Sequence, residues 1–533
     1  MIDHILHNAN VITMDESNPS ATSLAIDNDT IIGVGTDEEI LRLYTPAATL
    51  SDLKGLTVLP GLADSHCHMQ WLGQVQRGID LSTTTSYAEM VELVRTEAER
   101  QSQSDWIIGW GWNQESWPEP GLPSHHLLSE AVPDRPVWLI RVDTHAALAN
   151  ETALQRAGIT GSTQPPFGGA IVIESGEPTG VLVDKAMTLV DQLLPKPTLS
   201  ETSSQLLAAQ AHCLAFGLTQ VHDPGIDSSL IEAYRTLARN GQLKLRVNAM
   251  LRQEHMSPTT LIPIKEGRFT MQCIKVLLDG ALGSYGAALE SAYQDNPQEY
   301  GLLLLDTPEL LDSLSRAFEA GFQASIHAIG DRANRLALDA VEEVLNRLPR
   351  FDHRTRIEHA QVLRAEDIPR FADLGIIASV QPAQCPSDIV MSDARLGEDR
   401  ASRTHAWRSL LDTNVVLTAG SDTPVESLNP FWGIHASVTR ADHQGRPKTA
   451  WHPEQAMSLQ EALACYTSGP AYASFQDSKR GRIKAGYWAD LTIVDRDINN
   501  DDISVLLQTS VQATIIGGEI VYGSLPSVSP NTE

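Results

Sequence analysis

The feature that most constrains the fold of this chain is an alternation of short β-type runs with helical stretches along its middle. Helical stretches such as 200–216, 308–320, 333–348 and 365–374 separate most of the β-type runs. The eight runs cover residues 57–64, 217–222, 244–250, 272–278, 322–327, 355–359, 376–381 and 415–421. This alternation is typical of parallel β/α units. Eight units predict an α/β protein with a closed (β/α)8 barrel of the TIM type.

The two ends of the chain differ from the middle, since both are rich in short β-type runs. In the tail, Gly517-Gly518 separates two β-branched runs, which is a strong signal for a two-residue hairpin. We expect residues 1–56 and 480–533 to form one small β-sandwich domain built from both termini. Two unrelated β appendages are the alternative. The barrel then occupies residues 57–479.

A long segment interrupts the barrel between its first two predicted strands. It is too long for one crossover and is dense in glycine, proline and tryptophan, as in Gly109-Trp110-Gly111-Trp112 and Pro165-Pro166-Phe167-Gly168-Gly169. We therefore expect an inserted subdomain at about residues 75–200.

The overall charge narrows the class of partner. The chain has 39 basic and 67 acidic residues, a net charge of −28. Such a surface repels phosphate backbones and anionic lipid, so we expect no nucleic-acid and no membrane partner. No apolar stretch reaches the length of a membrane span.

The 5 cysteines are scattered without a CxxC pair, which disfavours a disulfide framework and favours a cytoplasmic protein. We expect a small molecule as the partner. The sequence leaves open whether the chain forms a homo-oligomer.

A pair of histidines ends the first predicted barrel strand. In Pro60-Gly61-Leu62-Ala63-Asp64-Ser65-His66-Cys67-His68, strand alternation projects His66 and His68 on one side. Two imidazoles placed in this way can hold one metal ion, and neutral imidazole suits Zn, Fe, Mn or Ni. A chance HxH pair is the alternative. The carboxyl end of a barrel strand is where active sites lie, which favours the metal site.

Three other strand ends repeat the pattern. His327, His359 and Asp422 end the fifth, sixth and eighth predicted strands. A single histidine at such a place is often structural. A barrel brings all these ends to one mouth, however, so residues far apart in sequence can share a metal site.

Lys275 is a cation among apolar neighbours in the fourth predicted strand, Ile274-Lys275-Val276-Leu277-Leu278. Its head could extend to water along the strand. If it is buried instead, its amine becomes neutral and can react with carbon dioxide. The resulting carbamate is an anionic ligand that can bridge two metal ions.

Taken together, this set of residues resembles that of the amidohydrolase superfamily of metal-dependent hydrolases. The more detailed similarity is to its YtcJ-like branch, which includes N-substituted formamide deformylase, and it runs over about residues 5 to 522. The matching motifs are the segment that ends in His66-Cys67-His68, Trp110-Gly111-Trp112, Asp143-Thr144-His145-Ala146, Asp279-Gly280-Ala281-Leu282-Gly283-Ser284, His327-Ala328-Ile329-Gly330-Asp331 and Gly420-Ser421-Asp422.

The resemblance implies one or two divalent ions, most commonly zinc, and a barrel flanked by a sandwich from both chain ends. The implied metal ligands are His66, His68, carbamylated Lys275, His327, His359 and Asp422. Asp422 is also the expected catalytic residue, which accepts a proton from the metal-activated water and returns it to the leaving nitrogen.

Three further residues are candidates for substrate contact. The resemblance favours this role for His145, and a capping or core histidine is the alternative. Trp112 is expected to form part of the pocket wall, with core packing as the alternative. Tyr285 follows Gly283-Ser284 where many relatives are expected to carry an arginine, so it is a candidate for altering substrate specificity.

The favoured function is therefore hydrolysis of an amide-type, non-peptide C–N bond in a small organic molecule. An ester, a lactone or a cyclic amide is the alternative substrate of the same metal site. A non-catalytic barrel that serves as a scaffold is a third possibility, which the complete set of histidines and Asp422 disfavours.

Overall fold

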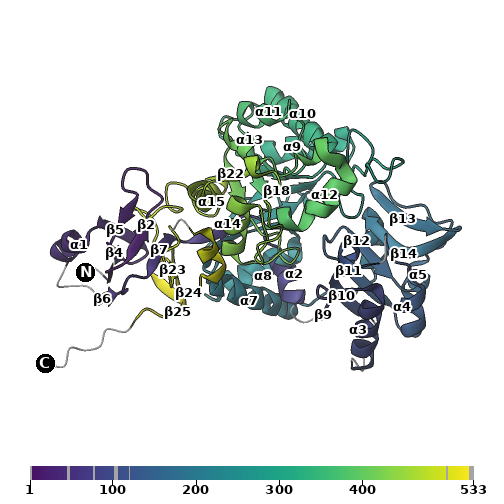
Figure 1. The fold of residues 1–533 in the computed structure, drawn as a ribbon, viewed down its shortest axis with the longest axis horizontal. Coiled ribbons are helices and arrows are strands. Elements are labelled where there is room, and N and C mark those ends of the chain that lie inside the picture. Colours follow the sequence, from purple (N-terminus) through teal and green to yellow (C-terminus); the bar gives the residue numbers. More distant parts are fainter. Residues whose placement is uncertain are drawn as a thin grey trace.

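A computed structural model describes residues 3–44, 49–75, 78–100, 106–118, 121–499 and 502–526. Parts of the expected domains that fall on residues 1–2, 527–533 and the gaps between these ranges lie outside the described residues. Sheets from both chain ends lie on the left in Figure 1, the barrel lies in the centre, and a third β region lies on the right. None of the described helices is long and apolar enough to cross a membrane.

The central sheet is the predicted barrel. Its eight parallel strands follow one another in chain order: β8 (Leu62–Asp64), β15 (Leu218–Ile226), β16 (Arg246–Arg252), β18 (Phe269–Leu277), β19 (Gln323–Ala328), β20 (Arg356–His359), β21 (Ile377–Val380) and β22 (Leu417–Ala419). A short strand, β17 (Ile264–Glu266), pairs antiparallel with β18. The backbone N–H of Ser65 donates to the Ala419 carbonyl at 2.9 Å, which links the first strand end to the last. The predicted barrel class is confirmed.

Amphipathic helices cover the outside of the barrel. In α9, the buried residues Leu310, Leu314, Ala317 and Phe318 recur at helical spacing, so one stripe faces the sheet. Asp306 and Glu309 form a capping box at its start. The helices of the barrel region are α2 (Met69–Val75), α7 (Leu199–Ala215), α8 (Ser228–Arg239), α9 (Thr307–Glu319), α10 (Asp331–Arg347), α11 (Ile368–Asp373), α12 (Gln384–Ala401), α13 (Trp407–Leu411), α14 (Pro430–Thr439), α15 (Leu459–Cys465) and α16 (Ser468–Ala473).

The first predicted barrel strand, 57–64, is divided between two sheets. Its first half, β7 (Thr57–Pro60), belongs to a terminal sheet, and only β8 belongs to the barrel. Gly61 lies between them, and a Cβ there would come within 2.3 Å of Thr219 Oγ1 on β15. The expectation of one continuous strand was wrong, because the chain changes sheets at this close approach.

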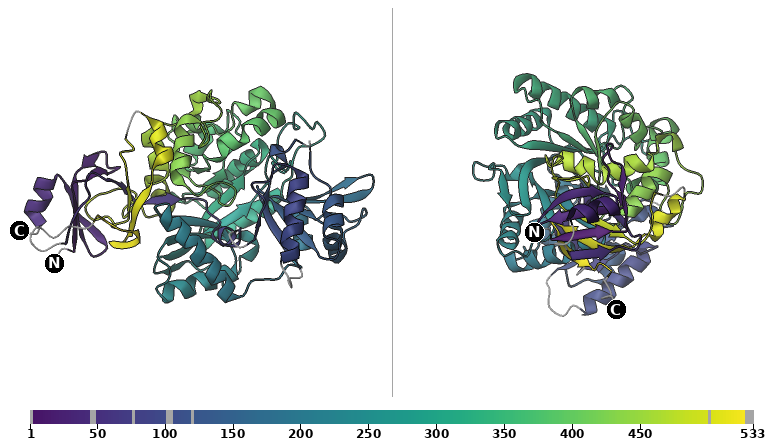
Figure 2. Two further views of the ribbon diagram at one scale, coloured as in Figure 1. Left: turned by 60° about the horizontal axis from the view of Figure 1, so that its bottom comes forward. Right: turned by 90° about the vertical axis from the view of Figure 1, so that its left-hand side faces the viewer.

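The terminal region consists of two sheets, and one of them combines both chain ends. The first contains β1 (His4–His7), β4 (Ser23–Asp27), β5 (Thr30–Gly35) and β6 (Thr49–Asp52), with helix α1 (Asp37–Tyr44) beside it. The second contains β2 (Asn10–Ile12), β3 (Ser20–Ala21), β7, β23 (Leu491–Val494), β24 (Val511–Ile516) and β25 (Glu519–Gly523). The right-hand view of Figure 2 shows the purple and yellow strands side by side.

The predicted hairpin is present in this mixed sheet. Ile516 pairs with Glu519, and Gly517 and Gly518 between them have φ of 59° and 75°. Two positive φ values in a row are what a type I′ turn requires, which is why glycine occupies both places.

The segment between β8 and β15 forms its own six-stranded sheet. The strands, in spatial order, are β13 (Gly169–Glu174), β14 (Glu177–Asp184), β12 (Ala146–Ala149), β11 (Val137–Arg141), β10 (Ile107–Trp112) and β9 (Ile79–Asp80). Its helices are α3 (Tyr87–Arg100), α4 (His126–Ala131), α5 (Glu151–Ala157) and α6 (Thr188–Asp191). Each face of the sheet buries its own apolar cluster. This sheet corresponds to the expected insert.

Candidate metal centre

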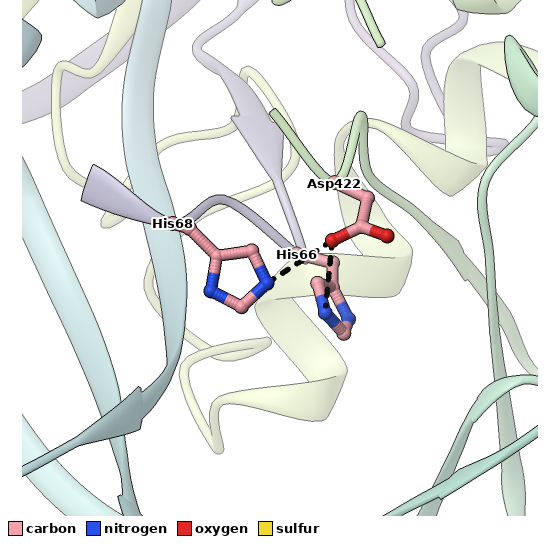
Figure 3. A group of neighbouring side chains, drawn as sticks. All are labelled: His66, His68 and Asp422. Atoms are coloured by element: carbon pink, nitrogen blue, oxygen red, sulfur yellow. Dashed lines mark ion pairs between the residues drawn. The ribbon is translucent and has the colours of Figure 1, made fainter. Parts of the chain in front are cut away.

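His66 and His68 follow the end of β8 and face a carboxylate from the other end of the barrel sheet. His66 Nε2 lies 3.4 Å and His68 Nε2 lies 3.1 Å from Asp422 Oδ1. The ligand atoms of the three residues all lie within 4.8 Å of one another (Figure 3). The structure therefore joins residues that are more than 350 positions apart, as the barrel topology predicts.

The local backbone explains this approach. Asp422 follows β22 with a positive φ of 59°, and its N–H donates to the His66 carbonyl at 2.7 Å. At Gly420, a Cβ would lie 2.4 Å from the His66 nitrogen, so no larger residue fits without a shift. Asp64 accepts from the Ser421 hydroxyl at 2.6 Å and from the His66 N–H at 2.9 Å. These contacts hold the two strand ends together.

Lys275, His327 and His359 line the same cavity as these three residues. The His359 ring lies 5.1 Å from that of His66 and 4.4 Å from that of His327, measured between centroids. We call His66, His68, Lys275, His327, His359 and Asp422 the ligand cluster. Five of its members are buried, and His68 is half-buried.

Lys275 does not extend to water. Its side chain is buried, and within the described part of the chain its Nζ has no hydrogen-bond partner. Burial lowers the pKa of this amine to about 8, although Glu358 and Asp422 nearby act in the opposite direction. His359 Nδ1 is also without a partner among the described residues. Buried polar atoms left unpaired at a cluster of imidazoles and a carboxylate fit a divalent ion with an anionic ligand on Lys275.

The charge states also suit metal binding. Burial lowers the pKa of His327 and His359 well below the usual value, which favours the neutral imidazole that coordinates metals. Burial alone would raise the pKa of Asp422. His66 and His68 outweigh that effect, so the pKa is lowered and the carboxylate form is favoured.

Two buried carboxylates orient the histidines, and neither had been predicted as a site residue. Glu358 accepts from His66 Nδ1 at 2.6 Å and from the Ser325 hydroxyl at 2.7 Å. Asp279 lies 3.1 Å from His327 Nδ1 and accepts from the N–H of Gly330 at 2.8 Å. Each contact leaves the Nε2 atom of the histidine for the cavity. The sequence signal for Glu358 is its place one residue before His359 in a buried strand.

The cavity has a volume of about 1240 Å³ and is lined by both the barrel mouth and the insert. From the insert, His145 reaches the ligand cluster, and its ring lies 5.1 Å from that of His327. His145 Nδ1 pairs with Asp184 Oδ1 at 2.6 Å. Burial by itself lowers the pKa of His145. The nearby carboxylates of Asp184 and Asp143 together outweigh this effect, so the pKa is raised to about 9. His145 therefore lines the cavity beside the ligand cluster.

Trp112 does not form the pocket wall. It is fully buried in the core on one face of the insert sheet, where its Nε1 donates to the Leu139 carbonyl at 2.8 Å. Trp110 lines the cavity instead. Strand alternation would put both rings on one face, but Gly111 has a φ of 97° and the pairing register shifts there. This bulge turns the two tryptophans to opposite faces.

Tyr285 also lies away from the cavity lining. Its ring lies under the Arg395 guanidinium at 3.9 Å, and its hydroxyl accepts from Arg395 Nη1 at 2.8 Å. Arg395 in turn pairs with Asp295 at 2.6 Å. The expectation of a substrate contact at Tyr285 is therefore not supported, because the side chain is held against α12.

Comparison with known proteins agrees with this geometry. The model of the amidohydrolase family matches residues 49–522. YtcJ, an amidohydrolase-family protein of Bacillus subtilis (strain 168), is 32% identical over 97% of this chain and 99% of its own. N-substituted formamide deformylase of Arthrobacter pascens is 28% identical, and 98% of each chain is covered. An uncharacterized metal-dependent hydrolase from Pyrococcus furiosus has the same fold, with a TM-score of 0.73, 28% identity and coverage of 93% of this chain and 99% of its own. From its sequence and its fold, the chain belongs to the amidohydrolase family.

Proposed function

We propose that this protein is a metal-dependent hydrolase that cleaves an amide-type, non-peptide C–N bond of a small organic substrate. The observation that carries the proposal is the convergence of His66, His68 and Asp422 beside the unpaired buried amine of Lys275. The cavity above them, of about 1240 Å³, has room for a small organic molecule. Membership in the amidohydrolase family supports the same class of reaction.

The ligand cluster would hold one or two divalent ions, with zinc as the first choice. For Lys275 to serve as an anionic ligand, its neutral amine attacks the carbon of carbon dioxide. An N–C bond forms, and the nitrogen loses one proton to give a carbamate. When bound, a divalent ion polarises a carbonyl group and makes water a usable nucleophile near neutral pH.

Asp422 moves the proton in this proposal. Its carboxylate accepts a proton from water as the water oxygen bonds to the carbonyl carbon. It then gives this proton to the nitrogen as the C–N bond breaks, so that a carboxylic acid and an amine leave. Gln384 Nε2 donates to Asp422 Oδ2 at 3.1 Å, which orients the carboxylate and leaves Oδ1 facing the histidines.

The bond type is supported by a relative. The name of N-substituted formamide deformylase describes hydrolysis of an amide that is not a peptide, and that protein matches almost the whole chain. His145, held by Asp184, is positioned to contact the substrate carbonyl from the insert side.

Elemental analysis and a substrate screen test the proposal together. Protein purified without chelators should contain about one or two zinc or similar ions per chain. It should release amine from formamides or other N-acyl amines. His68→Ala should lose both properties, whereas Trp432→Ala, a half-buried tryptophan outside the cavity lining, should keep them. Metal well below one ion per chain, with no gain on adding zinc, would contradict the metal site. Cleavage of lactones or esters alone would contradict the bond type.

The carbamate has its own test. Protein kept in ¹³C-bicarbonate should show a carbamate carbon signal by NMR, and Lys275→Ala should lack it. Lys275→Ala should also lose metal or activity, and a short-chain carboxylic acid should restore part of it. A wild-type protein without the signal would contradict this modification.

A further inference from the structure

Part of the cavity lining comes from the barrel and carries two carboxylates. We call this part the acidic side; its residues are Gln361, Ser387, Asp388 and Glu426. Gln361 follows β20, Ser387 and Asp388 belong to α12, and Glu426 lies in the loop after β22. Gln361 Nε2 donates to Asp388 Oδ2 at 2.7 Å, which joins two of these segments. The acidic side is therefore built by three segments that meet at the barrel mouth.

The acidic side adjoins Asp422 of the ligand cluster. Gln384, at the start of α12, donates from Nε2 to Asp422 Oδ2 at 3.1 Å. Asp388 lies four positions further along this helix, so it shares a helix face with Gln384. Asp422 lies near enough to Glu426 for its charge to act on the Glu426 carboxyl. A substrate bound at Asp422 would therefore have both carboxylates of the acidic side beside it.

The two carboxylates of the acidic side lack a basic side chain that would balance their charge. Among the described residues, no lysine or arginine forms an ion pair with Asp388 or Glu426. Burial raises the pKa of Glu426 to about 7, and the charge of Asp388 acts in the same direction. The Ser387 hydroxyl acts in the opposite direction but does not cancel the increase. Two adjoining carboxylates repel each other, and a bound cation would relieve this repulsion.

The insert treats its own acidic residues in this lining differently. Glu115 pairs with Arg395 at 2.5 Å, and Asp143 pairs with Arg141 at 2.6 Å. The charges of these two carboxylates are therefore balanced within the chain. By contrast, the charge of the acidic side stays available to a bound molecule.

A buried histidine behind Asp388 is a second, independent sign of a missing group. The His405 side chain is 3% exposed, and its Nε2 lies 3.5 Å from Asp388 Oδ2. This nitrogen has no hydrogen-bond partner among the described residues. Burial lowers the pKa of His405, so the neutral imidazole is favoured and does not balance the Asp388 charge. A buried polar atom left unpaired beside a cavity indicates that a group from outside the chain completes the arrangement.

From this arrangement we infer that the acidic side binds a cationic nitrogen group, an ammonium or a guanidinium, carried by the substrate. The substrate class is then an amide with a second, positively charged nitrogen several bonds away from the scissile one. This inference rests on the proposed function and narrows its substrate. A hydrogen bond from a charged nitrogen to a carboxylate is about twice as strong as a neutral one. An amide with such a nitrogen should therefore react better than a neutral amide of the same length.

Two pairs of amides test the preference for a cation. The first pair is N-(4-aminobutyl)formamide and N-pentylformamide, and the second pair is N-methyl-5-aminopentanamide and N-methylhexanamide. The two members of a pair have the same length, and only the first carries an ammonium group. For the wild-type protein loaded with zinc, kcat/KM should be about tenfold or more higher for the charged member of at least one pair. Equal or better cleavage of the neutral member in both pairs would overturn the inference.

Variants then test whether the two carboxylates are responsible. Glu426→Gln and Asp388→Asn keep the size of the side chain and remove its charge. The double variant should lower the preference for the charged amide from about tenfold to about twofold or less. Glu130→Gln serves as the matched control, because it removes an exposed carboxylate that does not line the cavity. An equal loss on the charged and the neutral amide in the double variant would contradict the inference.

Metal content separates a substrate site from a metal site. The double variant should contain as much zinc as Glu130→Gln, since the proposed ligands are the members of the ligand cluster. If the double variant loses zinc, Asp388 and Glu426 belong to the metal centre, and the inference is wrong.

Binding separates this inference from the proposed function. In isothermal titration, the purified protein should bind 1,4-diaminobutane about tenfold more tightly than pentylamine, and the double variant should lose this difference. If no amide is hydrolysed, the proposed function fails, and a diamine preference that depends on Asp388 and Glu426 still supports the acidic side. If the preference is absent or does not depend on these residues, the inference fails, even where amides are cleaved.

Discussion

The ligand cluster shares its cavity with an apolar wall from the insert, but different forces hold the two regions. The residues of this wall are Ile108, Trp110, Ile140, Met187 and Leu194. Members of the ligand cluster lie in or just after barrel strands, and two of them are oriented by hydrogen bonds from neighbouring strands, His66 to Glu358 and His327 to Asp279. The apolar wall has few polar atoms to fix, and it rests on a packed core of the insert. Under the proposed function, the chemistry of the site would depend on directional contacts, and its preference for a substrate would depend on shape. Changes to the two regions should have separable effects.

The largest effect is expected from Asp422→Asn. An amide side chain fills the same space but cannot accept and return a proton, so turnover should fall by roughly 10²–10⁴. The loss should be the same for alkyl and aryl amides, because the apolar wall is untouched. Steady-state kinetics and metal content of the variant beside the parent measure this. Turnover within a few-fold of the parent at equal metal content would remove Asp422 from the reaction.

Trp112→Ala should have a large effect on stability and none on selectivity. Its indole is fully buried and donates to the Leu139 carbonyl, so the substitution should cost about 3–5 kcal/mol of unfolding free energy in the insert. Urea unfolding followed by fluorescence measures the cost, with Trp432→Ala as the control. If the ratio of kcat/KM for aryl and alkyl amides changes in the folded variant, Trp112 contributes to the wall after all.

Glu358→Gln should weaken metal binding by roughly 10–100-fold, the usual effect of removing a group that orients a ligand. The neutral amide no longer holds the His66 Nδ1 proton in the same way. Competition with a chromogenic zinc chelator measures the affinity. Glu130→Gln, an exposed carboxylate on α4, is the matched control. An unchanged zinc affinity in Glu358→Gln would show that His66 keeps its orientation without this partner.

The smallest effect is expected from Tyr285→Phe. Only the hydrogen bonds of the hydroxyl to Arg395 and Asp295 are lost, which costs about 0.5–1.5 kcal/mol of unfolding free energy. Thermal unfolding should show a small decrease in stability, and kcat/KM should be unchanged for every amide. A decrease in kcat/KM for one substrate class alone would indicate that Tyr285 contacts the substrate.

The sequence predicted those features that follow from periodicity. All eight barrel strands overlap the β-type runs, because buried parallel strands produce continuous apolar runs, although only the second half of the run 57–64 belongs to the barrel. His66, His68 and Asp422 could be associated in advance, since a barrel gathers its strand ends at one mouth. Lys275 was recognised by its charge in an apolar run.

Other features depend on contacts that leave no local pattern. The bulge at Gly111 reverses the alternation that had placed Trp112 in the wall. The partner of His66, Glu358, lies 292 residues further along the chain, so no local spacing connects them. Tyr285 turns away because Arg395, from a distant helix, holds its ring. In each case the neighbouring sequence allowed two roles for the residue, and the fold decides between these roles.

The change of sheet at Gly61 has a consequence for the order in which the protein is made. On the ribosome, β7 emerges early but one of its two neighbours, β23, is among the last elements synthesised. β8 pairs with β15, which is synthesised only after the whole insert, and the contact of Ser65 with the end of β22 forms later still. Both β7 and the end of β8, which lead to His66 and His68, therefore contact segments that are translated late. We therefore expect His66 and His68 to reach their final positions only after nearly all of the protein has left the ribosome.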